Sequence, residues 1–108
     1  MPLVKRDNRV DLHLPVEVRG EDAIGARFTE LTHSLNVSGG GILFESQRQV
    51  PVGARLTLRI ELPAMLRHRF GNRDNYRALA VVCRVEQLEG EETRRVGARF
   101  LDSAGWAR

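Results

Sequence analysis

One stretch decides how this chain folds: SLNVSGGGILF, residues 34–44. Two polar side chains, Asn36 and Ser38, precede three glycines at 39–41, and an apolar strand follows at once. Because consecutive glycines are unfavourable in entropy, we expect the backbone here to approach another group closely or to adopt positive φ. Such a turn can aim several backbone N–H groups at one anion, with the two polar side chains as further donors. A plain glycine-rich hairpin between two strands explains the stretch equally well.

The rest of the chain alternates apolar and polar residues with the two-residue period of half-buried β-strands. Pro15 lacks an N–H, which predicts that the first strand lies at a sheet edge or is interrupted there. The segment 64–76 is longer than most hairpin connections and is interpreted as a flap or a partner-binding loop. No long amphipathic helix is evident, so the pattern predicts an all-β antiparallel barrel or sandwich. The predicted strands cover residues 10–18, 27–37, 42–45, 55–62, 78–87 and 94–101.

Parity within the strands predicts which side chains point inward. In the second strand the apolar parity changes between Phe28 and a set that begins at Leu31, so we expect a β-bulge near Glu30. His33 then belongs to the inward set and is interpreted as a hydrogen-bonded interior or rim residue rather than a metal ligand. Cys83 lies in an apolar run and is interpreted as a small buried strand residue.

Length, charge and cysteine content limit the classes of protein to which this chain can belong. The 108 residues are enough for one domain with one core. No apolar run reaches the ~20 residues of a membrane span, so we expect no membrane insertion. Charged residues close to Met1 argue against a secretion signal, and the single cysteine excludes an internal disulfide, so we expect a cytoplasmic protein. The net charge of +3 and the pI near 10.0 favour an anionic partner.

Two short motifs stand in order along the chain. KRDNR, residues 5–9, precedes the first strand, and NVSGGG, residues 36–41, lies between the second and third. Together they resemble the PilZ domain family, which has an R-x-x-x-R motif ahead of the first strand and a [D/N]-x-S-x-x-G motif on a later one. The ending VGARFLD, residues 96–102, is also similar to the family, so the resemblance covers nearly the whole chain. It implies a six-stranded antiparallel barrel, with at most a short C-terminal helix, that binds the bacterial second messenger cyclic di-GMP.

The resemblance also implies which residues bind this ligand. The second motif matches fully, whereas Lys5 stands where the first arginine of the other motif belongs. A lysine is a point charge, but an arginine fork can hold two acceptors of a guanine or a phosphate at once. Arg6 can replace it if the chain shifts by one residue. The implied ligand-binding residues are Lys5, Arg6, Arg9, Asn36, Ser38, Gly39, Gly40 and Gly41.

The implied organisation has three parts. A flexible basic arm at residues 1–9 precedes the barrel at residues 10–102, and a tail follows at residues 103–108. Ligand binding is expected to order the arm over the barrel. We expect this change to signal to a downstream protein partner in a process such as motility or biofilm formation.

Other classes of function stay open at this point. An adaptor that binds no nucleotide and acts through protein contacts, as in type IV pilus assembly, is favoured by Lys5 and by the long 64–76 segment. A small nucleic-acid-binding barrel is a third hypothesis, but aromatic residues are sparse, so no nucleic-acid partner is expected. An enzyme is not expected, because the three histidines are scattered and no nucleophile has a neighbouring base. No catalytic residue, metal or cofactor is therefore predicted, and cyclic di-GMP is the one ligand.

Overall fold

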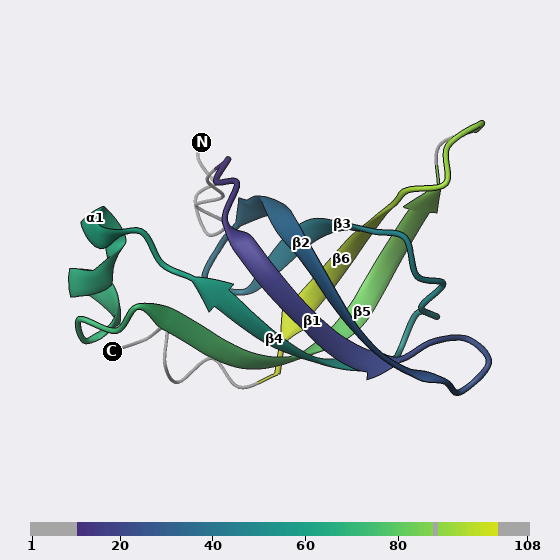
Figure 1. Cartoon of the computed structure of the whole chain (residues 1–108), viewed down its shortest axis with the longest axis horizontal. Helices are drawn as coiled ribbons and strands as arrows, with labels where there is room; N and C mark the ends of the chain where they lie inside the picture. Colours follow the sequence, from purple (N-terminus) through teal and green to yellow (C-terminus); the bar gives the residue numbers. More distant parts are fainter. Residues whose placement is uncertain (1–10, 88, 102–108) are drawn as a thin grey trace, which may run out of the picture.

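The computed structural model describes residues 11–87 and 89–101. Within these ranges six strands close into an antiparallel barrel in the order β1-β2-β3-β6-β5-β4 (Figure 1). This confirms the predicted six-stranded antiparallel barrel. A short helix, α1 (Ala64–Arg67), and a 3₁₀ turn, η2 (His68–Phe70), connect the fourth and fifth strands. The strands are β1 (Pro15–Glu21), β2 (Arg27–Val37), β3 (Gly41–Ser46), β4 (Arg55–Glu61), β5 (Asn75–Gln87) and β6 (Arg94–Phe100).

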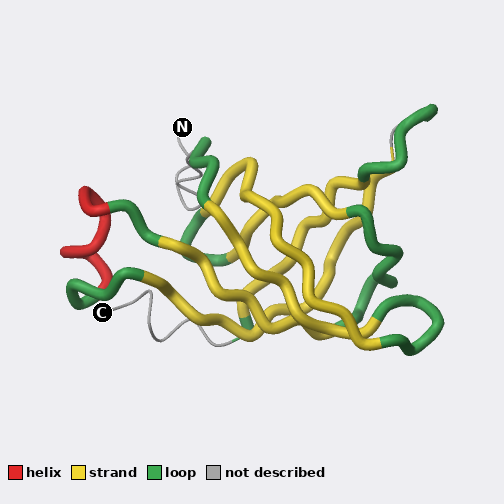
Figure 2. The backbone as a smooth tube through the Cα atoms, in the orientation of Figure 1, coloured by secondary structure: helices red, strands yellow, loops and turns green. Residues whose placement is uncertain are grey.

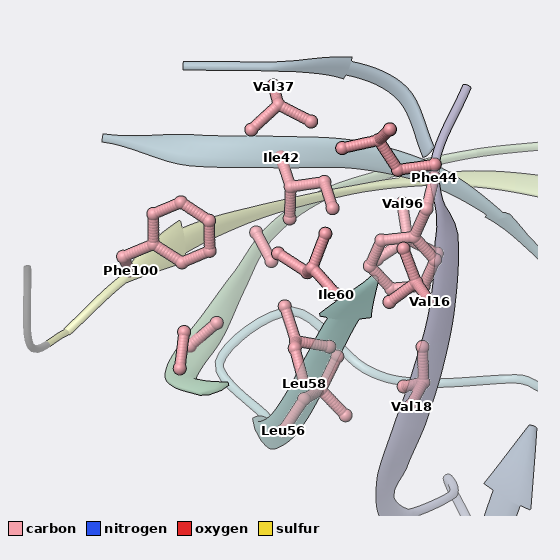
Figure 3. Close-up of a cluster of buried hydrophobic side chains, with 14 of the residues drawn as sticks. Val16, Val18, Val37, Ile42, Phe44, Leu56, Leu58, Ile60, Val96 and Phe100 are labelled. Carbon is pink, nitrogen blue, oxygen red and sulfur yellow. The ribbon is translucent and has the colours of Figure 1, made fainter. Parts of the chain in front are cut away.

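Alternate residues of every strand fill the barrel interior with apolar side chains (Figure 3). Leu58 of β4 and Val96 of β6 are fully buried at 0% exposure. Burying one such side chain stabilises the fold by roughly 1.5–3 kcal/mol. In the described part of the chain, closure of the barrel gives every strand a neighbour on both sides. The buried apolar residues are Leu14, Val16, Val18, Phe28, Val37, Ile42, Phe44, Val50, Leu56, Leu58, Ile60, Leu62, Tyr76, Ala78, Ala80, Val82, Val96, Ala98 and Phe100.

Of the two outcomes predicted from Pro15, the sheet edge is wrong, whereas the interruption is confirmed, because residues 11–14 lie outside the strand, which begins at Pro15. β1 pairs with β2 on one side and with β4 on the other. Pro15 opens the strand, and the β4 ladder begins one residue later at Val16, so the missing N–H removes no hydrogen bond from that ladder. The strand also continues through Gly20 to Glu21, beyond its predicted end at residue 18. A Cβ at Gly20 would lie 2.6 Å from a methyl carbon of Leu56, so a larger residue there would require the Leu56 side chain to shift.

The parity change in β2 is real, but the predicted position of the bulge is wrong. The register with β3 shifts between Ser34 and Asn36, which makes Leu35 the extra residue. Up to Ser34 the even-numbered residues therefore point inward, and Leu31 is 80% exposed. His33 is exposed too, with its Nε2 3.7 Å from a carboxylate oxygen of Glu45, and is not an inward residue.

A second bulge lies in β5. The register with β6 shifts between Val82 and Arg84, so Cys83 is the extra residue. Val82 is buried, whereas both Cys83 and Arg84 are exposed on the outer face. The prediction of a buried Cys83 is wrong, because a bulge sends two successive side chains to the same side of the sheet.

The connection between β4 and β5 leaves the barrel at one end and carries α1 and η2 (Figure 2). The turn η2 is capped at its C-terminal end by Gly71, whose φ of 70° is left-handed and favours glycine. The rings of Phe70 and Tyr76 pack at 5.5 Å between centroids, and Tyr76 is buried. These two aromatics are therefore not displayed for stacking on bases. In the part of the chain that the structure describes, no helix is long and apolar enough to cross a membrane.

Candidate ligand-binding groove

A groove of about 480 Å³ lies on the outer face of the barrel, across β2, β3, β6 and β5. It lies on the side of the barrel opposite to β1 and β4. Four of the predicted ligand-binding residues line it. The lining residues are Asn36, Ser38, Gly40, Gly41, Ile42, Leu43, Cys83, Arg84, Gly97, Ala98 and Arg99.

Strand register brings the side chains of one row of the groove together. Asn36 of β2 is paired with Leu43 of β3, Leu43 with Gly97 of β6, and Gly97 with Arg84 of β5. The row depends on both bulges: the one at Leu35 turns Asn36 outward, and the one in β5 sets the register of Arg84. Gly97 has no side chain, so nothing rises between Leu43 and Arg84, and the floor of the groove is open there.

The neighbouring row explains why position 41 is glycine. Gly41 is paired with Arg99 of β6. A Cβ at Gly41 would lie 2.5 Å from the carbonyl oxygen of Ala98, closer than real Cβ atoms come. The third glycine of the motif is therefore required for β3 to pack against the backbone of β6. Its φ is not in the left-handed region.

The turn before β3 is both a hairpin and one wall of the groove. The N–H of Ser38 donates to the carbonyl oxygen of Gly41 at 2.9 Å. The N–H of Gly40 donates to Oγ of Ser38 at 3.2 Å, so the hydroxyl proton of Ser38 is available for a ligand. Gly39 does not line the groove; it lines a separate apolar cavity at the end of the barrel. Two of the three glycines, Gly39 and Gly40, have no atoms near a built Cβ.

The charge in the groove is positive. Arg84 and Arg99 line it, and none of its lining residues is acidic. Within residues 11–87 and 89–101 neither arginine takes part in an ion pair, and the side-chain amide of Asn36 makes no hydrogen bond. Two guanidinium groups, a carboxamide and a hydroxyl therefore face one hollow, an arrangement that suits an anion with hydrogen-bonding edges.

A buried serine fixes the segment that leads into the groove region. Ser34 is 0% exposed and lies next to the bulged Leu35. Its Oγ accepts the N–H of Leu14 at 2.9 Å and donates to the carbonyl oxygen of Leu12, and its own N–H donates to the carbonyl oxygen of Leu14 at 2.8 Å. The chain before β1 is thereby held against β2, two residues from Asn36. Lys5, Arg6 and Arg9 lie outside the described residues.

The sequence did not identify Arg84 and Arg99 as site residues. The outward position of Arg99 could have been predicted from the sequence, because the alternation of β6 places this side chain outward. Arg84 is not, because the position of the β5 bulge and the pairing of Gly97 with β5 are properties of the tertiary structure. Within the described ranges no three side chains of histidine, cysteine, aspartate or glutamate gather into a group that could hold a metal.

Comparisons with known proteins identify relatives of this barrel. The family model described as PilZ domain matches residues 4–105. No curated protein sequence matches the chain significantly. The inhibitor of motility MotI/DgrA from Bacillus subtilis superposes with a TM-score of 0.67 at 23% identity, over 94% of this chain and 44% of that protein. The present chain therefore spans less than half of that relative.

Two further structures hold cyclic di-GMP. The PilZ domain of YcgR from Escherichia coli, solved with c-di-GMP, has a TM-score of 0.61 at 16% identity, with 94% of this chain and 81% of that chain covered. The complex of MrkH from K. pneumonia with c-di-GMP has a TM-score of 0.57 at 18% identity, with coverage of 93% and 44%. At these identities the likeness establishes a shared fold.

Proposed function

Since this chain belongs to the PilZ domain family, we propose that it is a receptor module for cyclic di-GMP and has no catalytic activity of its own. The observation that carries the proposal is the groove in which Asn36 and Ser38 of the family motif face the same hollow as Arg84 and Arg99. The fold neighbour from Escherichia coli was solved with this ligand, which supports the choice of nucleotide.

Each group in the groove has a task that the ligand's chemistry defines. Cyclic di-GMP carries two phosphates and two guanines, so a receptor needs cations, edge donors and acceptors, and backbone that permits close approach. Arg84 and Arg99 each offer a planar fork that can grip two phosphate oxygens or the O6 and N7 of a guanine. Asn36 and Ser38 offer hydrogen bonds at one end of the groove. The volume of about 480 Å³ lies within the range of small-ligand sites.

The basic arm completes the proposed site. Leu12 is held to Ser34 beside the groove, and Arg9 is only three positions earlier in the sequence. At roughly 3.4 Å per extended residue, Arg9 reaches about 10 Å from this anchor. Arg9 and Arg6, with Lys5, then close over the ligand from the side opposite Arg84. Ordering the arm is the proposed signal to a protein partner in the cytoplasm. Motility is the proposed process, because one fold neighbour is an inhibitor of motility.

Titration of the purified chain with cyclic di-GMP by isothermal calorimetry tests the proposal. We expect heat of binding for the wild type and none for Arg9→Ala, because that variant lacks the arginine of the arm that matches the family motif. Arg84→Ala is expected to weaken binding by about 10- to 150-fold, since one charge-assisted contact contributes ~1.5–3 kcal/mol. Arg95→Ala is the matched control, because Arg95 is an exposed arginine of β6 outside the groove.

Each alternative outcome has a defined meaning. Binding by Arg9→Ala with wild-type affinity would overturn the role of the arm. An equal loss of affinity for cyclic di-GMP in Arg84→Ala and Arg95→Ala would mean that binding depends on net charge and not on the groove. Absence of binding by the wild type would favour the adaptor that binds no nucleotide and acts through protein contacts.

A further inference from the structure

A second basic surface lies on the side of the barrel away from the groove. It is formed by the outward side chains of β1, β4 and the first half of β5. Four exposed arginines lie on these three neighbouring strands, and we refer to them together as the arginine face: Arg19, Arg55, Arg59 and Arg77. The ligand groove lies across β2, β3, β6 and the second half of β5, and its central strands β3 and β6 are opposite to β4 and β1 in the closed barrel.

Three hollows on this surface share residues and so form one continuous path. An open depression of about 800 Å³ near the β1–β2 turn is lined by Thr57 and by three arginines, Arg19, Arg27 and Arg55, against two acidic residues, Glu21 and Asp22. A small hollow of about 120 Å³ contains Arg19 and Thr57 again, together with Arg59 and Arg77. A third, of about 520 Å³, contains Arg77 again. Two further arginines, Arg67 and Arg73, lie at that end of the path.

The charges of the arginine face are not balanced within the fold. Arg59 lies directly opposite Arg77 in the β4–β5 ladder, and like charges in that position are unfavourable. Arg59 has an ion pair with Glu61 at 3.2 Å, and Arg19 has one with Glu17 at 3.5 Å. Among the described residues neither Arg55 nor Arg77 has such a pair. The small hollow between Arg19, Arg59 and Arg77 is also lined by Glu17, so three guanidinium groups face one carboxylate there and the remaining positive charge can receive a second carboxylate.

The other side chains on the path favour a protein over a nucleic acid. Leu79, which is 41% exposed, lies opposite Thr57 at the middle of the face and offers an apolar contact. The aromatic ring on the path, Phe28, is buried and unable to stack on bases.

We propose that the arginine face binds an acidic segment of a partner protein, laid across β1, β4 and β5. Carboxylates of that segment contact Arg19, Arg59 and Arg77, and an apolar side chain packs on Leu79. Because the groove lies on the opposite strands, the partner and a nucleotide can bind together. This docking surface goes beyond the nucleotide-receptor function and does not depend on it.

A defined peptide tests this surface. The probe is a short fluorescein-labelled peptide in which glutamate alternates with serine around one central leucine, and its fluorescence anisotropy is measured against the whole chain at low salt. We expect saturable binding by the wild type. The double variant Arg59→Gln/Arg77→Gln should bind about tenfold more weakly, because two exposed ion pairs with the peptide are lost.

The control keeps the net charge of the test variant. Arg94→Gln/Arg95→Gln removes two arginines of β6 that lie outside every hollow of the face, and should bind the peptide as the wild type does. The midpoint temperature of thermal unfolding should be no lower for the test variant than for the wild type, because the substitutions remove the repulsion between Arg59 and Arg77. The proposal is overturned if the wild type does not bind the peptide or if both double variants weaken it equally. Tighter binding of a single-stranded oligothymidine, lost in the test variant, would also overturn it and assign the face to nucleic acid.

Discussion

At the scale of single residues, the three glycines of the turn before β3 have different structural roles. The three glycines at 39–41 are equivalent in sequence, but only at Gly41 would a Cβ meet the backbone of β6, at 2.5 Å from Ala98 O. Gly41→Ala is therefore expected to lower the free energy of unfolding by about 1–3 kcal/mol, the usual range for overpacking. Urea unfolding followed by circular dichroism measures this loss.

Gly39→Ala is the matched control for Gly41→Ala. Its built Cβ meets no atom within 4 Å and its φ is not left-handed. Alanine there restricts the unfolded chain and should leave stability unchanged or raise it by about 0.5 kcal/mol. Equal losses in the two variants would contradict the assigned role of Gly41 and indicate that the whole turn requires glycine.

At the scale of elements, two β-bulges decide which side chains reach the groove. The extra residue in β5 leaves Cys83 exposed, with Sγ 3.5 Å from the carbonyl oxygen of Val81 as its described contact. We expect a maleimide to label Cys83 in the native protein almost as fast as in urea, with labelling followed by mass spectrometry. Because Cys83 lines the groove, saturating cyclic di-GMP should slow the reaction.

The lone cysteine makes the labelling experiment unambiguous, since the sequence holds no other thiol. GMP at the same concentration is the control for a non-specific effect of nucleotide. Labelling that requires prior unfolding would mean that Cys83 is buried and that the bulge does not form. Rapid labelling that cyclic di-GMP leaves unchanged would mean that the ligand does not cover this part of the groove.

At the scale of the whole molecule, stability rests on the closed barrel and its single core. Leu58 is 0% exposed on β4, so Leu58→Ala is expected to cost about 2–5 kcal/mol. A domain of this kind has only ~5–15 kcal/mol in total, so the loss should be visible as a large fall in the urea midpoint.

Leu31→Ala serves as the control for the core substitution. Leu31 is 80% exposed on β2, and its replacement should change stability by no more than ~0.5 kcal/mol. A large loss of stability in Leu31→Ala would instead support the inward orientation of Leu31 that the sequence predicted. It would also place the β2 bulge near Glu30 rather than at Leu35.

The sequence by itself predicted six antiparallel strands, because alternation and turn chemistry are local properties, and its resemblance to the PilZ family implied the barrel and the motif residues Asn36 and Ser38. Tertiary structure decided where the bulges fall, and with them the exposure of Leu31 and Cys83. It also decided that Arg84 lies in the same row as Asn36. A one-residue shift in a strand reverses every side chain after it, and its position is set by packing against neighbouring strands, which no local pattern contains.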